Sequence, residues 1–355
     1  MRLSCLLTLA CFSFVTEAFV LQKQQQPQTT SLNALGRVGE LFREEVVEKP
    51  KKKVDNVGLF LAEAFGSDAG IDSCAIADMC AENVIFEDLS SSEPIVGRRA
   101  MEAALRQKFP VASRLVVERT AGNATTGGFT WRRECVGDDS KFGLRGTTYG
   151  RVEDGELVYL REASEPLFKA GELTEKLLRA ATANMEKVKK KKTFVVSEPE
   201  RASDIVEYLW LEASPKGAGP EVALSFFADD IIYEDFNYQE PFVGIDAVRN
   251  FIEAFDIPGV EFIPEEISGG ADACCFTWKV LVNKADGPQG VSFYATNSDN
   301  KVSYVRDIPA TKPAFLQQLA ALIDPKLRVF QPRNSSTLLF PPSGGNGPPT
   351  TTTPL

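Results

Sequence analysis

Two acidic pairs, Glu87-Asp88 and Glu234-Asp235, are the residues whose types and spacing best fit a chemical step. Each pair ends a run of strand-forming residues, and each is followed by a short loop and the same Glu-Pro-x-Val-Gly string. An aspartate that faces an apolar pocket has a raised pKa, so it can take a proton from a carbon beside a carbonyl. Asp235 and Asp88 are therefore the candidates for a catalytic general base.

A structural interpretation of the same pairs stays open beside the catalytic one. An aspartate at the end of a strand can accept a hydrogen bond from the turn that follows it. The neighbouring glutamate can form an ion pair across the sheet with Arg161 in the first half of the chain or Arg306 in the second. Both copies would then share a loop that the fold requires.

The absence of histidine narrows the chemistry open to this sequence. None of the 355 residues is a histidine, which excludes Ser-His-Asp and Cys-His catalysis, His-ligated zinc and imidazole acid–base chemistry. Two of the seven cysteines lie in an N-terminal apolar stretch, and the other five show no CxxC spacing. We predict buried thiols in a reducing compartment, with Cys274 and Cys275 on opposite faces of a strand, and no metal or cofactor.

The acidic pairs belong to a longer duplication. Two segments recur 147 positions later without a gap, and a third recurs 145 positions later. Such self-similarity over a long period indicates two copies of a domain, each with its own core. The matching segments are Glu87–Gly97 with Glu234–Gly244, Phe129–Trp131 with Phe276–Trp278, and Tyr159–Glu162 with Tyr304–Asp307.

Hydrophobic periodicity and turn residues predict the same order of elements in both copies, with helices first and a mostly antiparallel sheet afterwards. This order indicates an α+β fold. A helix over 172–185 is expected to bridge the copies. In the second copy we predict helices over 202–213, 221–227 and 245–255, and strands over 231–236, 260–267, 273–282, 290–296 and 301–307.

The ends of the chain and the join between the copies have compositions of their own. Arg2, an apolar run and Thr16-Glu17-Ala18 are typical of a signal peptide, and the acid-free stretch after it is typical of a transit peptide. No membrane-spanning segment is expected in the mature protein. The predicted parts are a signal peptide 1–18, a transit-like segment 19–45, repeat 1 over 55–185, a basic linker 186–200, repeat 2 over 201–327 and a disordered tail 328–355.

The strand and loop motifs resemble those of the nuclear transport factor 2-like superfamily, which includes SnoaL-type cyclases and ketosteroid isomerases. Phe227–Asp235 is similar to the way these proteins enter their first strand, and Glu240–Gly244 to their next helix entry. The pattern, together with Arg161–Pro166, is most similar to a plastid-targeted SnoaL-like group of plants and algae. The resemblance implies two tandem cone-shaped domains, each a curved sheet around helices, in the plastid stroma; a secreted protein is the alternative.

The resemblance also implies roles for individual residues. In ketosteroid isomerases the aspartate at the position of Asp235 is the base, and a tyrosine at the position of Tyr208 is the hydrogen-bond donor. The isomerases carry a protonated aspartate where the sequence alignment puts Ser292 in repeat 2 and Thr147 in repeat 1. The catalytic set is therefore incomplete, and whether the protein is an enzyme stays undecided.

Aromatic side chains support a binding function, while the net charge of −10 argues against nucleic acid as a partner. Three functions follow: binding of an apolar small molecule such as a pigment, an isoprenoid or a lipid derivative; an isomerase or cyclase; and a scaffold whose repeats pair as an intramolecular pseudo-dimer. The residues predicted to bind a ligand are Tyr233, Phe276, Trp278, Phe293, Tyr304, Arg306, Phe129, Trp131 and Arg161.

Overall fold

The computed structural model describes residues 53–68, 70–109, 113–135, 143–167, 169–183 and 199–310. The predicted signal peptide, transit segment and C-terminal tail lie outside the described residues, as does most of the basic linker. All described residues belong to one compact unit, residues 50–355.

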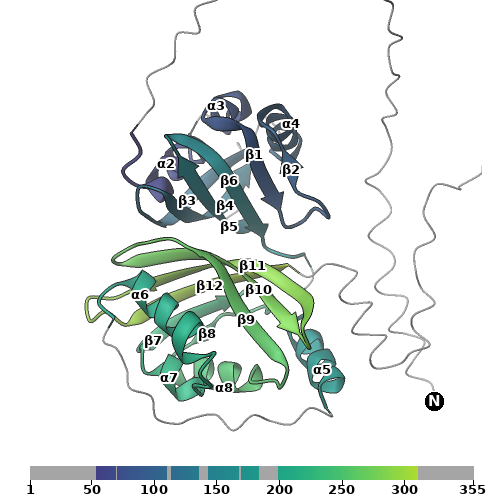
Figure 1. Cartoon of the computed structure of the whole chain (residues 1–355), viewed down its shortest axis with the longest axis vertical. Coiled ribbons are helices and arrows are strands. Elements are labelled where there is room, and N and C mark those ends of the chain that lie inside the picture. The colour runs from purple at the N-terminus through teal and green to yellow at the C-terminus, as the bar shows by residue number, and fades with distance from the viewer. Residues whose placement is uncertain are drawn as a thin grey trace, which may run out of the picture. The chain divides into compact units, whose positions relative to one another are not determined.

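Repeat 1 consists of two short helices, two strands, a longer helix and four more strands (Figure 1). A further helix, α5, follows its last strand. The elements are α2 (Val57–Phe65), α3 (Ser73–Asp78), β1 (Cys80–Asp88), β2 (Ile95–Val96), α4 (Arg98–Lys108), β3 (Ser113–Gly122), β4 (Thr126–Cys135), β5 (Arg145–Glu153), β6 (Glu156–Ser164) and α5 (Gly171–Ala181).

Repeat 2 follows the same order, except that its first helix changes from α-helical to π-helical hydrogen bonding half-way along. The elements are α6 (Ala202–Glu207), the π-helical turn η1 (Tyr208–Ala213), α7 (Pro220–Leu224), β7 (Phe227–Asp235), β8 (Phe242–Val243), α8 (Ile245–Ala254), β9 (Val260–Ile267), β10 (Ala273–Val282), β11 (Ala285–Thr296) and β12 (Val302–Ala310).

The two sheets have the same topology. Their strand orders are β2-β1-β6-β5-β4-β3 and β8-β7-β12-β11-β10-β9, so each is a six-stranded mixed sheet. β1 pairs in parallel with β6, and β7 with β12, while the other pairs are antiparallel. Figure 1 shows the strands of repeat 2 curving over the side that carries α6, α7 and α8. The predicted α+β class with two tandem domains is confirmed.

The duplicated Pro-x-Val-Gly string makes the same corner in both repeats. Val96 pairs with Ile85, and Val243 pairs with Ile232, which adds a two-residue strand to the sheet edge. Gly97 and Gly244 then begin the next helix with φ values of 100° and 84°, a backbone region that favours glycine. The string is therefore needed by the fold in each copy.

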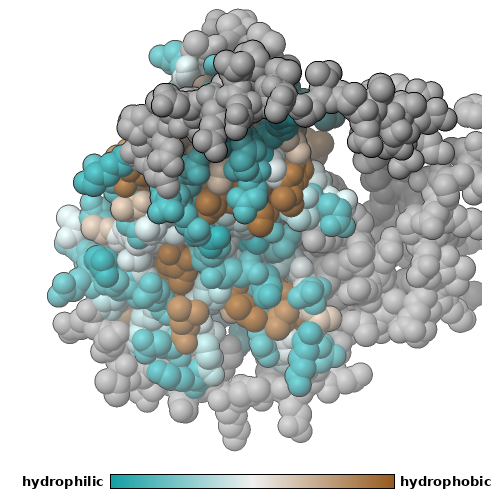
Figure 2. Space-filling view, turned by 45° about the horizontal axis from the view of Figure 1, so that its top comes forward, coloured by the Kyte–Doolittle hydropathy of each residue, from teal (hydrophilic) through white to brown (hydrophobic). Residues whose placement is uncertain are grey.

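Apolar residues on these edge strands reach the surface in both repeats. Val96 is 61% exposed and Val243 is 62% exposed. Figure 2 shows hydrophobic side chains on one face of the molecule in small groups that hydrophilic side chains separate. Scattered groups of this size are ordinary for a protein surface.

Each repeat has its own apolar core, with a tryptophan in the same place. The indole Nε1 of Trp131 donates to Thr148 Oγ1 at 2.9 Å, and that of Trp278 donates to Ser292 Oγ at 2.7 Å. These equivalent hydrogen bonds make Thr148 the counterpart of Ser292. The sequence alignment, which matched Ser292 with Thr147, was wrong by one residue because the connection between the last two strands is one residue longer in repeat 2.

The cysteine predictions hold in part. Cys274 belongs to the core of repeat 2, whereas Cys275 faces repeat 1, so the adjacent thiols lie on opposite faces as predicted. Cys80, Cys274 and Cys275 are buried. Cys74 is exposed, which corrects the expectation that it is buried; its thiol lies on the surface beside Glu102, 3.2 Å from the carboxylate Oε1.

The faces of the two sheets that point away from the helices pack against each other. β3 and β4 contact β10, and β5 and β6 contact β11. An apolar cluster there combines Tyr149 and Tyr159 of repeat 1 with Cys275, Phe236 and Phe293 of repeat 2. The two repeats are therefore paired through their sheets within the chain.

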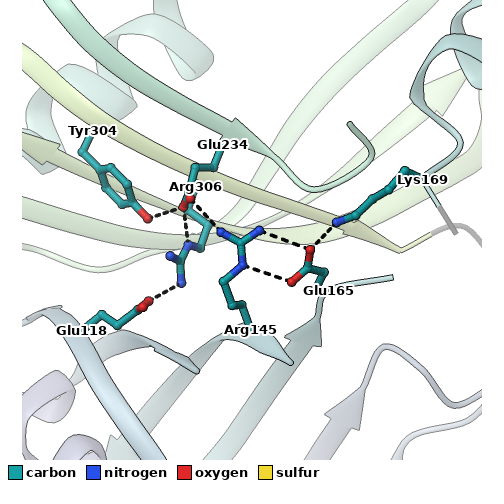
Figure 3. Close-up of polar contacts among 7 residues, drawn as sticks. All are labelled: Glu118, Arg145, Glu165, Lys169, Glu234, Tyr304 and Arg306. Carbon is teal, nitrogen blue, oxygen red and sulfur yellow. Dashed lines mark hydrogen bonds and ion pairs between the residues drawn. The ribbon is translucent and has the colours of Figure 1, made fainter. Parts of the chain in front are cut away.

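Ion pairs cross this contact in a symmetric way. Arg161 binds Glu87 of its own repeat through Nε at 2.6 Å and Glu265 of repeat 2 through Nη1 at 2.7 Å. Arg306 likewise binds Glu234 of its own repeat at 2.9 Å and Glu118 of repeat 1 at 2.7 Å. Figure 3 shows the second half of this arrangement, in which Arg145 of repeat 1 also binds Glu234, at 2.9 Å. The predicted pairing of Glu87 and Glu234 with the two strand arginines is confirmed.

Candidate binding cavity and carboxylate pair in repeat 2

Repeat 2 contains a partly open cavity of about 280 Å³. Its lining comes from η1, α7, α8, β7, β9 to β12 and from α5, the helix that follows repeat 1. This volume is just below the range of roughly 300–1,000 Å³ that is usual for small-molecule sites. The aromatic residues of the lining are Trp210, Tyr233, Phe251, Phe255, Phe262, Trp278 and Tyr294.

The π-helical turn brings a tryptophan into the wall. The N–H of Ser214 donates to the carbonyl of Leu209, and that of Ala218 to the carbonyl of Ala213, each at 2.9 Å and across five residues. Trp210 packs on Phe262 with ring centroids 4.5 Å apart, and both rings line the cavity. The sequence predicted an uninterrupted α-helix here. Single π turns occur often at functional sites, where they redirect side chains.

Helix α5 closes part of the same cavity from outside repeat 2. Its Thr174 and Leu178 are lining residues, and Leu178 forms a small apolar cluster with Ile257 and Val282. The N–H of Gly171 at its start donates to the carbonyl of Asn237 at 3.0 Å. The segment between the repeats is thus part of the cavity wall.

Two carboxylates lie on neighbouring strands in the polar part of the lining. Asp235 on β7 and Asp307 on β12 are register partners in the parallel pair. Asp307 accepts hydrogen bonds from the hydroxyls of Tyr233 and Ser292, one on each oxygen. Asp235 accepts one from the backbone N–H of Asn237 at 2.8 Å. Both side chains, like Tyr233, line the cavity.

Burial changes the titration of this pair. The pKa of Asp235 is raised to about 7, first because of burial and then because of the charge on Asp307, against the weaker effects of the Asn237 N–H and of Lys169. Burial raises the pKa of Asp307 to about 6, opposed by the hydrogen bonds from Ser292 and Tyr233. The charges of these neighbouring carboxylates interact, so they titrate as a unit, and the raised pKa values keep a proton on the pair in mildly acidic solution. Such a pair can both accept and donate a proton.

Repeat 1 has an equivalent pair, but there a lysine bridges the two carboxylates. Asp88 on β1 and Glu162 on β6 are register partners, as Asp235 and Asp307 are. The ammonium of Lys108, at the end of α4, lies 2.6 Å from Asp88 Oδ2 and 2.7 Å from Glu162 Oε1. Burial favours a higher pKa for Asp88, but Lys108 and Ser90 outweigh it, so the pKa is lowered. Asp88 is therefore held as a carboxylate in an ion pair.

The position of Lys108 is filled by Phe255 in repeat 2, at the 147-residue spacing of the duplication. Phe255 directly follows α8 and is a lining residue of the cavity. No lysine or arginine of the described chain lines this cavity. The carboxylate pair of repeat 2 thus lacks the cation that its counterpart has.

The structure brings together three of the residues that the sequence singled out. Asp235, Tyr233 and Trp278 all line the cavity. Tyr208, the predicted donor, lies instead in the core, with its ring edge-on to Phe226 at 5.6 Å between centroids, and is not a lining residue. Asp88 lies in repeat 1, paired with Lys108.

The other residues predicted to bind a ligand are placed elsewhere. Phe276 packs in the core of repeat 2 without lining the cavity: it shares a face of β10 with the lining residue Trp278, and its ring packs on that of Tyr294 with centroids 5.2 Å apart. The residues in the core of repeat 1 are Phe129 and Trp131. The residues in the contact between the sheets are Phe293, Tyr304, Arg306 and Arg161.

Sequence reasoning missed three residues of the site: Asp307, Tyr294 and Trp210. A signal for Asp307 was present, since the recurrence of Tyr159–Glu162 as Tyr304–Asp307 places an acid at the same strand position in both copies. Parallel pairing of the first and last strands then brings this acid beside Asp235. The π turn that directs Trp210 has no equivalent signal in the sequence.

Two further features are absent from the described part of the chain. No group of three or more cysteine, aspartate or glutamate side chains there is arranged to hold a metal ion. None of the helices that the structure describes is both long and apolar enough to cross a membrane.

Comparison with known proteins gives similar folds among solved structures only. No family model and no curated protein matches the sequence. A SnoaL-like family protein from Agrobacterium tumefaciens is 22% identical, with 31% of this chain and 97% of that chain covered and a TM-score of 0.25. A nuclear transport factor 2-like protein of unknown function from Mesorhizobium loti is 20% identical, with 27% and 79% covered and a TM-score of 0.24. A designed protein with a curved β-sheet is 18% identical, with 36% and 97% covered and a TM-score of 0.27.

Proposed function

We propose that repeat 2 binds a largely apolar small molecule in its cavity and that the Asp235–Asp307 pair anchors the polar group of that molecule. The observation that carries this proposal is the combination of aromatic walls with two neighbouring carboxylates in one cavity. Apolar walls supply most of the binding free energy of such a site, and a few placed polar groups fix orientation. Repeat 1 serves as the structural partner.

The test is a search for a bound molecule by native mass spectrometry. The protein is incubated with a lipid and pigment extract of an alga, and its mass and absorbance are recorded under gentle conditions. A stoichiometric apolar adduct is expected. Ala223→Phe, which places a ring at a lining position, should abolish the adduct. The control is Ala104→Phe at a half-buried helix position of repeat 1, which should retain it.

Proton transfer by an isomerase or cyclase is a second candidate function, because Asp235 titrates near neutral pH beside Asp307. In this reaction Asp235 takes a proton from a carbon next to a carbonyl, and the pair returns it to another carbon. The donor predicted from sequence, Tyr208, is outside the cavity lining, which leaves the Asp307–Tyr233–Ser292 hydrogen bonds as the polar support. Exchange of α-hydrogens of a bound ketone for deuterium tests this candidate, and Asp235→Asn should stop the exchange.

The proposed place of action is the plastid stroma. The signal-like segment 1–18 followed by the acid-free segment 19–45 supports this proposal. Fusion of residues 1–45 to a fluorescent protein in an alga whose plastid derives from a red alga tests it. Fluorescence in the medium instead of the plastid would support secretion.

A further inference from the structure

The chain itself contains an example of what complements this carboxylate pair. In repeat 1 the ammonium of Lys108 bridges Asp88 and Glu162, with N–O distances of 2.6 and 2.7 Å. The Lys108 side chain is 16% exposed and that of Glu162 is fully buried, so the group satisfied there is an ammonium removed from water. The geometry matches, because a primary ammonium has three donors to direct at two carboxylates, and its single positive charge offsets one of their two negative charges.

Repeat 2 keeps the two carboxylates but has no lysine between them. Asp235 and Asp307 have the same register as Asp88 and Glu162, while Phe255 stands at the lysine position and lines the cavity. The other wall groups suit a cation with an apolar body. Aromatic rings attract cations through their faces, and most strongly where water is excluded.

We propose that the cavity of repeat 2 binds an organic amine with an apolar body, whose ammonium lies between Asp235 and Asp307 as that of Lys108 lies between Asp88 and Glu162. This inference rests on the proposed binding function and names the class of ligand. A neutral ligand leaves the pair to share a proton, whereas an ammonium favours the ionised form of both carboxylates.

The charged and titratable groups around the pair set its pH dependence. Asp307 faces the hydroxyls of Tyr233 and Ser292, and Asp235 faces Lys169 at a distance where only a weak charge effect remains. The ammonium of Lys169 is bound to Glu165 at 2.5 Å.

Two tyrosines lie close to the pair, and one more carboxylate belongs to the cavity lining. The ring of Tyr294 lines the cavity beside it, Tyr238 lies within charge range of Asp235, and Asp256 adds a third carboxylate to the lining. None of these groups is a cation. Amine binding should therefore expel protons from the carboxylate pair and strengthen as the pH rises from 5 to 8, while an aliphatic amine stays protonated.

The test compares two probes of equal shape, naphthylmethylamine and naphthylmethanol, by titration calorimetry with the full chain. At pH 8 the amine should bind roughly tenfold or more tightly than the alcohol, the factor expected for one charge-assisted hydrogen bond. The preference should shrink at pH 5. In buffers that differ in ionisation enthalpy, the observed heat should reveal proton release with the amine only.

Two variants with matched controls separate charge from shape. Phe255→Lys supplies an ammonium from the protein, as in repeat 1, and should abolish the preference for the amine; Phe255→Met has similar length without charge and should keep it. Asp235→Asn should also remove the preference while the alcohol still binds. A folded protein is confirmed in each case by urea denaturation.

The outcomes distinguish the amine assignment from the proposed binding function on which it rests. Equal or tighter binding of the alcohol at pH 8 would overturn the amine assignment and leave an apolar binding cavity standing. If neither probe binds and no extract component binds either, both proposals fail. An amine preference that survives Asp235→Asn would also overturn the assignment, because the cation would then lie elsewhere.

Discussion

Phe255 stands in repeat 2 where Lys108 stands in repeat 1, and this difference separates a carboxylate pair bridged by a lysine from one that faces a cavity. Strand register and the corner before the helix are the same in both copies, although α8 ends one residue earlier than α4. The duplication therefore kept the framework and changed the charge balance at a single point. In repeat 1 the carboxylate pair stabilises the domain by binding Lys108, whereas in repeat 2 the carboxylate pair can bind a ligand or a proton.

Lys108→Met should destabilise the protein strongly. Removing one partner from a buried ion pair leaves the other charges uncompensated, at a cost of about 3–5 kcal/mol. Urea denaturation at pH 7 measures the change. The control, Lys176→Met, removes a lysine that is 75% exposed, and its effect should stay within about 0.5 kcal/mol. Comparable effects of the two variants would contradict the role assigned to Lys108. If the protein with Lys108→Met is too unstable to purify, adding Glu162→Gln should restore part of its stability.

Asp235→Asn should stabilise the protein at high pH. Asp235 titrates near about 3.9 in the unfolded chain and at about 7 in the folded one. Between these values only the folded state holds the proton, so stability falls as pH rises through this window and stays low above it. Without the titrating group, the variant should exceed the wild type by about 1–3 kcal/mol at pH 8 and match it near pH 4.

Asp88→Asn provides the matched control, with the opposite sign. The pKa of Asp88 is lowered in the folded state, so its contribution to stability is present above the unfolded-state pKa and is lost as the pH falls. The variant should be less stable than the wild type at pH 7, and the difference should shrink in acid. Denaturant melts of both variants from pH 4 to 8 make the comparison; parallel pH profiles would contradict the assignment of the two pairs.

Much of the fold could be predicted from sequence because local signals and the duplication agree. Alternating apolar residues predict the strand β7, and the Pro-x-Val-Gly string predicts the corner before α8, where the positive φ favours glycine. The duplication then predicts the same elements in the other repeat. The predicted helix over 202–213 has the observed bounds, but its hydrogen bonds become π-helical from Tyr208 onward. Helix propensity does not distinguish a π turn from an α-helical one, and so the placement of Trp210 against Phe262 could not be predicted.

The site was harder to predict than the fold. Asp235, Tyr233 and Trp278 were found because motif and strand alternation place them on one face. Alternation cannot tell the face towards the helices from the face towards the other repeat, and so Tyr304 and Arg306 were assigned to a ligand although they lie between the sheets. That distinction depends on how two sheets pack, which only tertiary structure shows.

The paired sheets predict a monomeric chain. The contact between repeats buries Tyr149, Cys275 and Phe293, so the surface that would pair with another copy is already covered. Multi-angle light scattering across a range of concentrations should give the mass of one chain. A stable homodimer that forms through the sheet faces would contradict the pseudo-dimer interpretation. A homodimer that forms through a different surface should persist when the charges of Glu118 and Glu265 are changed.

The symmetric ion pairs between the repeats should each stabilise the pairing measurably. Arg306 with Glu118 and Arg161 with Glu265 join the sheets at 2.7 Å, and the two arginine side chains are only 5% and 7% exposed. Each arginine is buried and binds a second carboxylate, so we expect a coupling energy of about 1–3 kcal/mol per pair. Double-mutant cycles with Arg→Met and Glu→Gln, read by urea denaturation, measure it.

An exposed pair provides the reference for these cycles. Lys176 and Glu172 are 75% and 81% exposed, and their coupling should not exceed about 0.5 kcal/mol. If the two inter-repeat couplings are equally small, the ion pairs are incidental and the apolar cluster alone holds the sheets together. Similar values for both inter-repeat pairs are expected, because each joins the last strand of one repeat to the strand at the far edge of the other repeat's sheet.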